Sequence, residues 1–140
     1  MAKARVIWNQ DMQFVGITES GHAVVVDATP DHGGYGSAPS NTEMIAVAQG
    51  GCTGMDIVSI LQKKRVAFDR FEMEVDLQPT KEHPRYIQRV EITYKIWGED
   101  LSKDAIHRAV ELSLEKYCIV AHTLRGRAEL SYKILINPSE

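Results

Sequence analysis

The residues of this sequence best able to do chemistry are its two cysteines, Cys52 and Cys118. The thiolate is the reactive form of a cysteine, and its pKa falls near cationic side chains or helix N-termini. The alternative is that both are small buried hydrophobic residues, because free cysteine is among the most buried residue types. No basic residue is close to Cys52 in the sequence. A cation that stabilises its thiolate would therefore have to arrive through a tertiary contact.

Two further polar residues have a helical spacing to the cysteines. Asp56 lies four residues after Cys52, on the same face of a helix. Its carboxylate would disfavour a thiolate unless it holds a cation in place, and we favour a hydrogen bond to a backbone group at a helix crossing. His122 lies four residues after Cys118 and could form a soft-metal site with both cysteines. Three ligands without a paired Cys-x-x-Cys are a poor zinc pattern, so we expect no metal ion and no cofactor.

Composition and charge exclude several functional classes. The net charge is −3 and the pI is near 5.9, so the basic surface that nucleic-acid binding needs is not expected. The N-terminal residues contain no apolar segment of the kind that starts a secretory signal, and we expect a cytoplasmic protein. The glycines of residues 29–41 are not followed by the Gly-Lys-Ser/Thr of a phosphate-binding loop. This segment is therefore interpreted as a plain shaped loop.

The element that must position Cys52 is a long apolar helix. Ser40 and Glu43 precede it in the Ser-x-x-Glu pattern of a capping box, and the helix is expected to continue to about Arg65. It is apolar on nearly every face, so it should be buried on all sides; its charged Asp56 argues against a membrane span. Its glycines lower helix propensity, which we interpret as close approach of another backbone at a helix crossing. They are Gly50, Gly51 and Gly54.

The rest of the chain predicts an α+β fold. Residues 3–8, 12–18 and 22–28 are expected to form three short strands, and residues 71–78 and 90–97 alternate apolar and polar side chains as an antiparallel pair should. A second helix should start at its N-cap Ser102, with residues 117–124 as a bent continuation and residues 130–136 as a last strand. We expect one domain, residues 1–140, with mostly antiparallel sheets around the central helix. A symmetric dimer would bury that helix.

Three segments together resemble the OsmC/Ohr family, and more narrowly its OsmC-like branch with Gly-Gly-Cys-Thr-Gly in the central helix. The segments are Pro39–Met44, Ala48–Arg65 and Glu115–Val120. The resemblance implies an intertwined homodimer in which sheets from both chains surround two central helices. It also implies reduction of hydroperoxides, with a preference for organic ones, in the oxidative stress response.

The resemblance also assigns roles to residues. Cys52 corresponds to the peroxidatic cysteine and Cys118 to the resolving cysteine, and the resemblance implies that an external dithiol, such as that of a lipoyl protein, restores both. Ohr proteins carry a glutamate ten positions before the cysteine and an arginine near the N-terminal strands. Here Glu43 lies nine positions before Cys52, which turns its side chain by about 100° around the helix. Glu43 is a candidate catalytic residue, although we favour its capping role. Arg5 is the only arginine of the N-terminal strands.

Two other functions remain open from the sequence. A non-catalytic dimer could bind a hydrophobic small molecule between its apolar helices, and this function would survive the loss of Cys52. A structural stress protein with inert, buried thiols is the least specific alternative.

Overall fold

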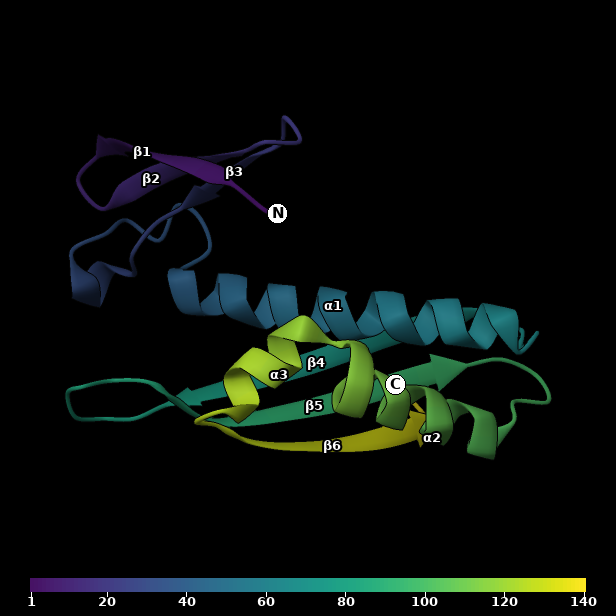
Figure 1. Cartoon of the computed structure of the whole chain (residues 1–140). Helices are drawn as coiled ribbons and strands as arrows, with labels where there is room; N and C mark the ends of the chain where they lie inside the picture. The colour runs from purple at the N-terminus through teal and green to yellow at the C-terminus, as the bar shows by residue number, and fades with distance from the viewer. The chain divides into compact units, whose positions relative to one another are not determined.

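The computed structural model describes all residues, 1–140, and the chain divides into two compact units, Met1–Ile45 and Ala46–Glu140 (Figure 1). The first unit contains an antiparallel sheet of β1 (Ala4–Gln10), β2 (Gln13–Thr18) and β3 (Ala23–Val26), in the order β1-β2-β3. This arrangement confirms the three short strands that the sequence predicts.

The loop after β3 is organised around the buried carboxylate of Asp27. This carboxylate accepts hydrogen bonds from the backbone N–H groups of Ala28, Tyr35 and Ser37 and from the Ser37 hydroxyl at 2.6 Å. The Ser37 hydroxyl bond is the main reason that the pKa of Asp27 is lowered. A Cβ on Gly34 would lie 1.9 Å from the Ala28 carbonyl oxygen, so glycine is required there by close backbone approach. The segment, which includes the 3-10 turn η1 (Pro30–His32), is the shaped loop that the sequence predicts.

The central helix α1 (Asn41–Lys63) begins with the predicted capping box. The Ser40 N–H donates to Glu43 Oε2 at 2.7 Å, and the Glu43 N–H donates to Ser40 Oγ at 3.3 Å. The helix ends slightly before the predicted Arg65. By length and composition alone α1 could also cross a bilayer, but core helices of water-soluble proteins pass the same test.

The second unit is a mixed sheet covered on one face by helices. Strands β4 (Arg70–Pro79) and β5 (Ile87–Trp97) are antiparallel, as predicted, and β6 (Glu129–Ile136) pairs with β5 in parallel. The expectation of mostly antiparallel sheets therefore misses one pairing. A parallel neighbour needs a crossover connection, and the helical segment between β5 and β6 provides it (Figure 1).

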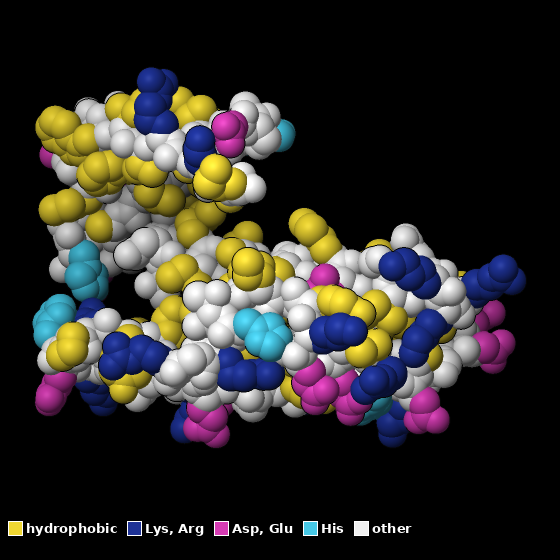
Figure 2. All heavy atoms as spheres, viewed as in Figure 1, with side chains coloured by type: hydrophobic (Ala, Val, Ile, Leu, Met, Phe, Trp, Pro, Cys, Tyr) yellow, Lys and Arg dark blue, Asp and Glu magenta, His cyan; other side chains and the backbone are white.

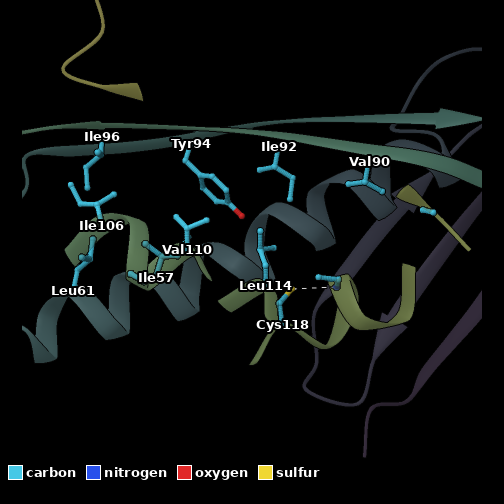
Figure 3. Close-up of a cluster of buried hydrophobic side chains, with 13 residues drawn as sticks. Ile57, Leu61, Val90, Ile92, Tyr94, Ile96, Ile106, Val110, Leu114 and Cys118 are labelled. Atoms are coloured by element: carbon cyan, nitrogen blue, oxygen red, sulfur yellow. Dashed lines mark hydrogen bonds between the residues drawn. The ribbon is translucent and has the colours of Figure 1, made fainter. Parts of the chain in front are cut away.

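The core lies between this sheet and the helices of the second unit. In Figure 3, Val90, Ile92, Tyr94 and Ile96 point from β5 towards the helices. They meet buried side chains of α1, of α2 (Lys103–Leu112) and of the segments that follow it: Ile57, Leu61, Ile106, Val110, Leu114 and Cys118. Burial of apolar surface is worth roughly 25 cal/mol per Å², which makes this layer the main source of stability of the unit.

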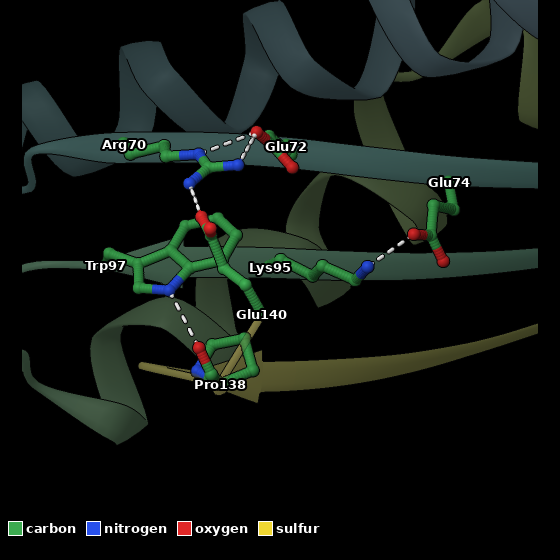
Figure 4. Close-up of polar contacts among 7 residues, drawn as sticks. All are labelled: Arg70, Glu72, Glu74, Lys95, Trp97, Pro138 and Glu140. Carbon is green, nitrogen blue, oxygen red and sulfur yellow. Dashed lines mark hydrogen bonds and ion pairs between the residues drawn. The ribbon is translucent and has the colours of Figure 1, made fainter.

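The opposite face of the sheet is polar. Arg70 forms ion pairs with Glu72 and Glu140, and Lys95 pairs with Glu74 (Figure 4). The indole N–H of Trp97 donates to the Pro138 carbonyl at 3.0 Å. These contacts attach the C-terminal residues to the sheet. The alternation of apolar and polar residues in β4 thus gives the strand one face in the core and one face in solvent, as predicted.

The second helical segment is broken more sharply than the sequence predicts. Ser102 is the N-cap of α2, as predicted, since its Oγ accepts from the Ala105 N–H at 3.3 Å. The chain then makes a π-helical turn, η2 (Ser113–Tyr117), and starts a separate helix, α3 (Ile119–Arg125). Residues 117–124 are therefore no bent continuation of α2, because the extended backbone of Cys118 (φ −71°, ψ 102°) ends one helix and starts the next.

Within the single chain, α1 is not buried on all sides as predicted. Its buried face contains Gln49, Gly50, Thr53, Gly54, Ile57 and Leu61. On other faces, Val47 is 65% exposed and Met55 is 76% exposed. A single chain therefore leaves part of the apolar surface of α1 exposed.

The glycines of α1 also differ from expectation. A Cβ on Gly54 would lie 2.7 Å from Met73 Cε, and one on Gly50 would lie 3.4 Å from Val75 Cγ2. Their close neighbours are therefore side chains of β4 and not the backbone of a crossing helix. A Cβ on Gly51 would meet nothing within 4 Å. Gly51 instead lines an open groove of about 470 Å³ together with Met55, Val58, Phe71 and Met73.

Candidate functional site

The fold of the second unit brings the two cysteines together. Cys52 comes from the middle of α1 and Cys118 from the junction of η2 and α3, yet their sulfur atoms lie within 4.8 Å of each other. Both are free thiols, Cys118 fully buried and Cys52 partly exposed. A buried sulfur next to a more accessible one gives the two cysteines different access to solvent and to a reagent.

The π-helical turn holds Cys118 in place. The Cys118 N–H donates to the Ser113 carbonyl at 2.7 Å, which closes the wide turn. The Cys118 sulfur is the N-cap of α3 and accepts from the Ala121 N–H at 3.4 Å. On its other side, Gln49 Nε2 donates to the same sulfur at 3.5 Å. Single π-helical turns often occur at functional sites, and here the turn sets the position of a thiol.

The environment of Cys118 favours its protonated form. Burial is the largest effect and raises the pKa of the Cys118 thiol to about 11, and the hydrogen bond with Cys52 acts in the same direction. The bonds from Ala121 and Gln49 oppose this shift but do not overcome it. At neutral pH Cys118 is therefore a thiol, whose S–H can donate to the Cys52 sulfur.

A buried hydrogen-bond chain ends at Asp56, beside the thiols. Ser113 Oγ lies 2.9 Å from both Asp56 Oδ2 and Thr53 Oγ1, and Thr53 Oγ1 lies 2.9 Å from the Tyr94 hydroxyl. The Ser113 hydroxyl is the donor to the Asp56 carboxylate oxygen. Ser113 Oγ is also the donor to Thr53 Oγ1, so its one proton is shared between Asp56 and Thr53. Between Thr53 and Tyr94, either hydroxyl can donate. Burial raises the pKa of Tyr94, which keeps it a donor.

These hydrogen bonds correct the prediction for Asp56. Its partner is the hydroxyl of Ser113, not a backbone group at a helix crossing. The prediction failed because Ser113 is distant in sequence and no local pattern marks it. The same holds for Tyr94, which reads from the sequence only as an apolar position of an alternating strand.

Gln49 is a further polar residue at the site that the sequence interpretation missed. It is fully buried, its Nε2 donates to Cys118, and its Oε1 has no hydrogen-bond partner. Buried amide oxygens are normally satisfied. The helical spacing of Gln49 and Cys52, three residues apart, could have indicated that both lie on one side of α1.

The remaining candidates lie elsewhere or are engaged otherwise. Glu43 belongs to the first unit, where the backbone hydrogen bond from Ser40 is the main cause that lowers the pKa of its carboxyl; its catalytic role stays a prediction. Arg5 is exposed on β1. The side chains close enough together to share a metal ion are those of Cys52, Asp56 and Cys118. His122, which the sequence analysis considered as the third ligand, is not among them.

Comparison with known proteins identifies the family. The sequence profile of the OsmC family, described as OsmC-like protein, matches residues 34–133. The chain belongs to the OsmC-like family. Among its relatives, Protein YhfA of Escherichia coli (strain K12) is 37% identical over 130 residues, which cover 93% of this chain and 94% of YhfA. Both cysteines of this OsmC-like chain lie inside the matched region.

Solved structures show the same fold. An OsmC-like protein of unknown function from Vibrio cholerae has a TM-score of 0.83 at 15% identity, over 96% of this chain and 99% of that one. An organic hydroperoxide resistance protein OsmC from Legionella pneumophila has a TM-score of 0.70 at 16% identity, over 96% of each chain. At this level of identity the likeness is one of fold, and it confirms the predicted α+β architecture with a central helix.

Proposed function

We propose that this OsmC-like protein is a thiol-dependent hydroperoxide reductase of the oxidative stress response, acting on organic hydroperoxides in the cytoplasm. The observation that supports it best is the pair of free thiols whose sulfur atoms lie within 4.8 Å. The name of the Legionella structure, an organic hydroperoxide resistance protein, supports the substrate class.

In the proposed first step Cys52 is the peroxidatic residue. Its thiolate attacks one peroxide oxygen, the O–O bond breaks, and the substrate leaves as an alkoxide that takes up a proton to become an alcohol. Cys52 is then a sulfenic acid. The partial exposure of Cys52 allows a peroxide to reach it, whereas Cys118 is fully covered.

In the second step Cys118 is the resolving residue. Its sulfur attacks the Cys52 sulfur, a disulfide forms, and the sulfenic oxygen leaves as water with the Cys118 proton. An external dithiol, such as that of a lipoyl protein, then reduces the disulfide by exchange. The net reaction consumes one hydroperoxide and two thiol hydrogens and yields an alcohol, water and a disulfide. A protonated Cys118 suits this order, because a thiol is a weaker nucleophile than a thiolate and does not compete with Cys52 for the peroxide.

We also propose that residues 1–140 act as one domain within a homodimer. In each unit apolar side chains are exposed: Val47 and Met55 on α1, and Val6, Trp8 and Val25 on the sheet β1–β3. Figure 2 shows hydrophobic side chains at the surface of both units. Exposed apolar patches of this kind mark interaction surfaces. We also propose Glu43 as a third residue of the site. Its capping bonds with Ser40 are the simpler explanation of its position.

The test is peptide mass spectrometry after one equivalent of cumene hydroperoxide is added to the fully reduced protein. We expect a Cys52–Cys118 disulfide in the natural chain, a sulfenic acid at Cys52 in Cys118→Ser, and unconsumed peroxide with Cys52→Ser. Unmodified thiols in the natural chain after prolonged exposure would overturn the proposal.

A second candidate function is binding of a hydrophobic small molecule. The apolar groove of about 470 Å³ between α1 and β4 favours it. Binding in this groove should survive Cys52→Ser, whereas peroxide reduction should not. A fluorescent apolar probe such as anilinonaphthalene sulfonate, titrated into the natural chain and Cys52→Ser, separates the two functions.

A further inference from the structure

We propose that the reduced site binds a soft divalent cation, of which Zn²⁺ is the representative, through Cys52, Cys118 and Asp56. The two sulfur atoms and a carboxylate oxygen of Asp56 all lie within 4.8 Å of one another. Thiolate and carboxylate are both established zinc ligands, and three protein ligands with one open position are a common zinc arrangement. The sequence analysis considered His122 as the third ligand beside the two cysteines and expected no metal ion, whereas the fold places Asp56 there.

The spacing of the three ligands fits a metal ion. With Zn–S of about 2.3 Å and Zn–O of about 2.0–2.2 Å, tetrahedral geometry separates ligand atoms by roughly 3.5–3.8 Å. The present upper limit of 4.8 Å is about 1 Å above that range. A disulfide needs the sulfurs to approach to about 2.05 Å. Closure onto a metal ion therefore asks for less movement than closure into a disulfide.

The carboxylate of Asp56 is already oriented. Its Oδ2 accepts from Ser113 Oγ at 2.9 Å, and Ser113 is held by Thr53. Bonds of this kind to ligands fix their direction and strengthen metal sites. Asp56 forms no ion pair, and its Oδ1 has no hydrogen-bond partner among the side-chain contacts. Burial of a charge is costly unless the charge is paired, so a cation bound beside this half-buried carboxylate would stabilise it.

The unpartnered amide oxygen of Gln49 is the second observation that points to a ligand. Gln49 is fully buried and its Nε2 lies 3.5 Å from Cys118 Sγ, so the amide group borders the thiols. Its Oε1 has no donor. A water molecule in the fourth position of the metal ion would donate to this oxygen and satisfy it.

Metal binding and disulfide formation use the same sulfurs and exclude each other. The cation keeps both thiols reduced, and a disulfide formed in the cycle of the proposed function would release it. This last consequence rests on the proposed function, whereas the binding site itself does not.

The experiment uses Co²⁺ as a spectroscopic probe of the reduced full-length chain under anaerobic conditions. We expect one Co²⁺ per chain, with a thiolate-to-cobalt charge-transfer band and intense visible bands of tetrahedral coordination, lost when one equivalent of Zn²⁺ is added. Asp56→Asn should weaken binding at least tenfold, and Cys118→Ser should abolish the charge-transfer spectrum of the dithiolate site. Asp56→Glu, which keeps a carboxylate, should retain binding.

The matched control is Asp76→Asn, which removes an exposed carboxylate on β4 without an ion pair. It should bind Co²⁺ as the natural chain does. Absence of thiolate-to-cobalt absorption at stoichiometric Co²⁺, or equal affinity of Asp56→Asn and Asp76→Asn, would overturn the proposal. Because the readout is metal absorption, it can fail while peroxide consumption persists, and it can succeed where peroxide consumption fails.

Discussion

Cys118 is a fully buried thiol whose sulfur serves as a helix cap, and its chemistry depends on that environment. The first prediction concerns its reactivity with iodoacetamide, which only a thiolate attacks quickly. With a pKa raised to about 11, mainly by burial, and no exposed surface, Cys118 should be modified slowly at pH 8, and its rate should rise with pH up to about 11. Mass spectrometry of each cysteine peptide against pH gives the profile. A midpoint near the ordinary 9.0 would contradict the assignment.

The same shift predicts the pH dependence of stability. Below about pH 9 the Cys118 thiol is protonated in both the folded and the unfolded chain. Between about pH 9 and 11 the unfolded chain loses this proton while the folded chain retains it, so the free energy of unfolding should fall as the pH rises. Urea titrations at pH 8 and 10.5 check this, and Cys118→Ala should show a smaller fall than the natural chain.

Ser113 connects Asp56 to the buried hydroxyls of Thr53 and Tyr94. Ser113→Ala removes the donor to both Asp56 and Thr53, and leaving buried polar groups without partners costs about 1–3 kcal/mol. We expect the free energy of unfolding in urea to fall by that amount. Ser131→Ala, at an exposed position of β6, is the control and should change stability little. Equal effects of both substitutions would show that the hydrogen bonds of Ser113 contribute nothing to stability.

At the scale of elements, the sequence predicts what local patterns determine. The capping box of Ser40 and Glu43, the Ser102 cap and the alternation of β4 all depend on neighbours within a few residues, and all are present. The π-helical turn before Cys118 and the partner of Asp56 depend on residues that only the fold brings together. Sequence reasoning consequently found both cysteines but not the hydroxyl chain or Gln49 around them.

The N-cap of α2 provides a test at this scale. Ser102 Oγ accepts from the Ala105 N–H, and loss of such a cap costs about 1 kcal/mol. Ser102→Ala should lower the free energy of unfolding by about that much, whereas Ser102→Asp, which can still accept, should leave it nearly unchanged. Urea denaturation followed by circular dichroism measures both. Similar losses in the two variants would mean that the cap is not the cause.

At the scale of the whole molecule, the exposed apolar face of α1 is the feature that one chain leaves unexplained. Gly51 lies on it, with nothing within 4 Å of a Cβ placed there, beside the groove that Met55 and Val58 line. A single chain would tolerate a larger side chain at this position. A second chain packed closely on the same face would not, because only small residues allow helices to approach so nearly.

Gly51→Leu therefore separates a monomer from the proposed dimer. We expect the dissociation constant of the dimer to rise at least tenfold, equivalent to about 1.4 kcal/mol, when it is measured by sedimentation as a function of concentration. Lys64→Leu adds a similar apolar side chain at an exposed position after α1 and should leave the constant unchanged. If Gly51→Leu associates as the natural chain does, the dimer does not use this face. A natural chain that stays monomeric at all concentrations would remove the explanation for the apolar surface of α1 and leave the groove to the small-molecule alternative.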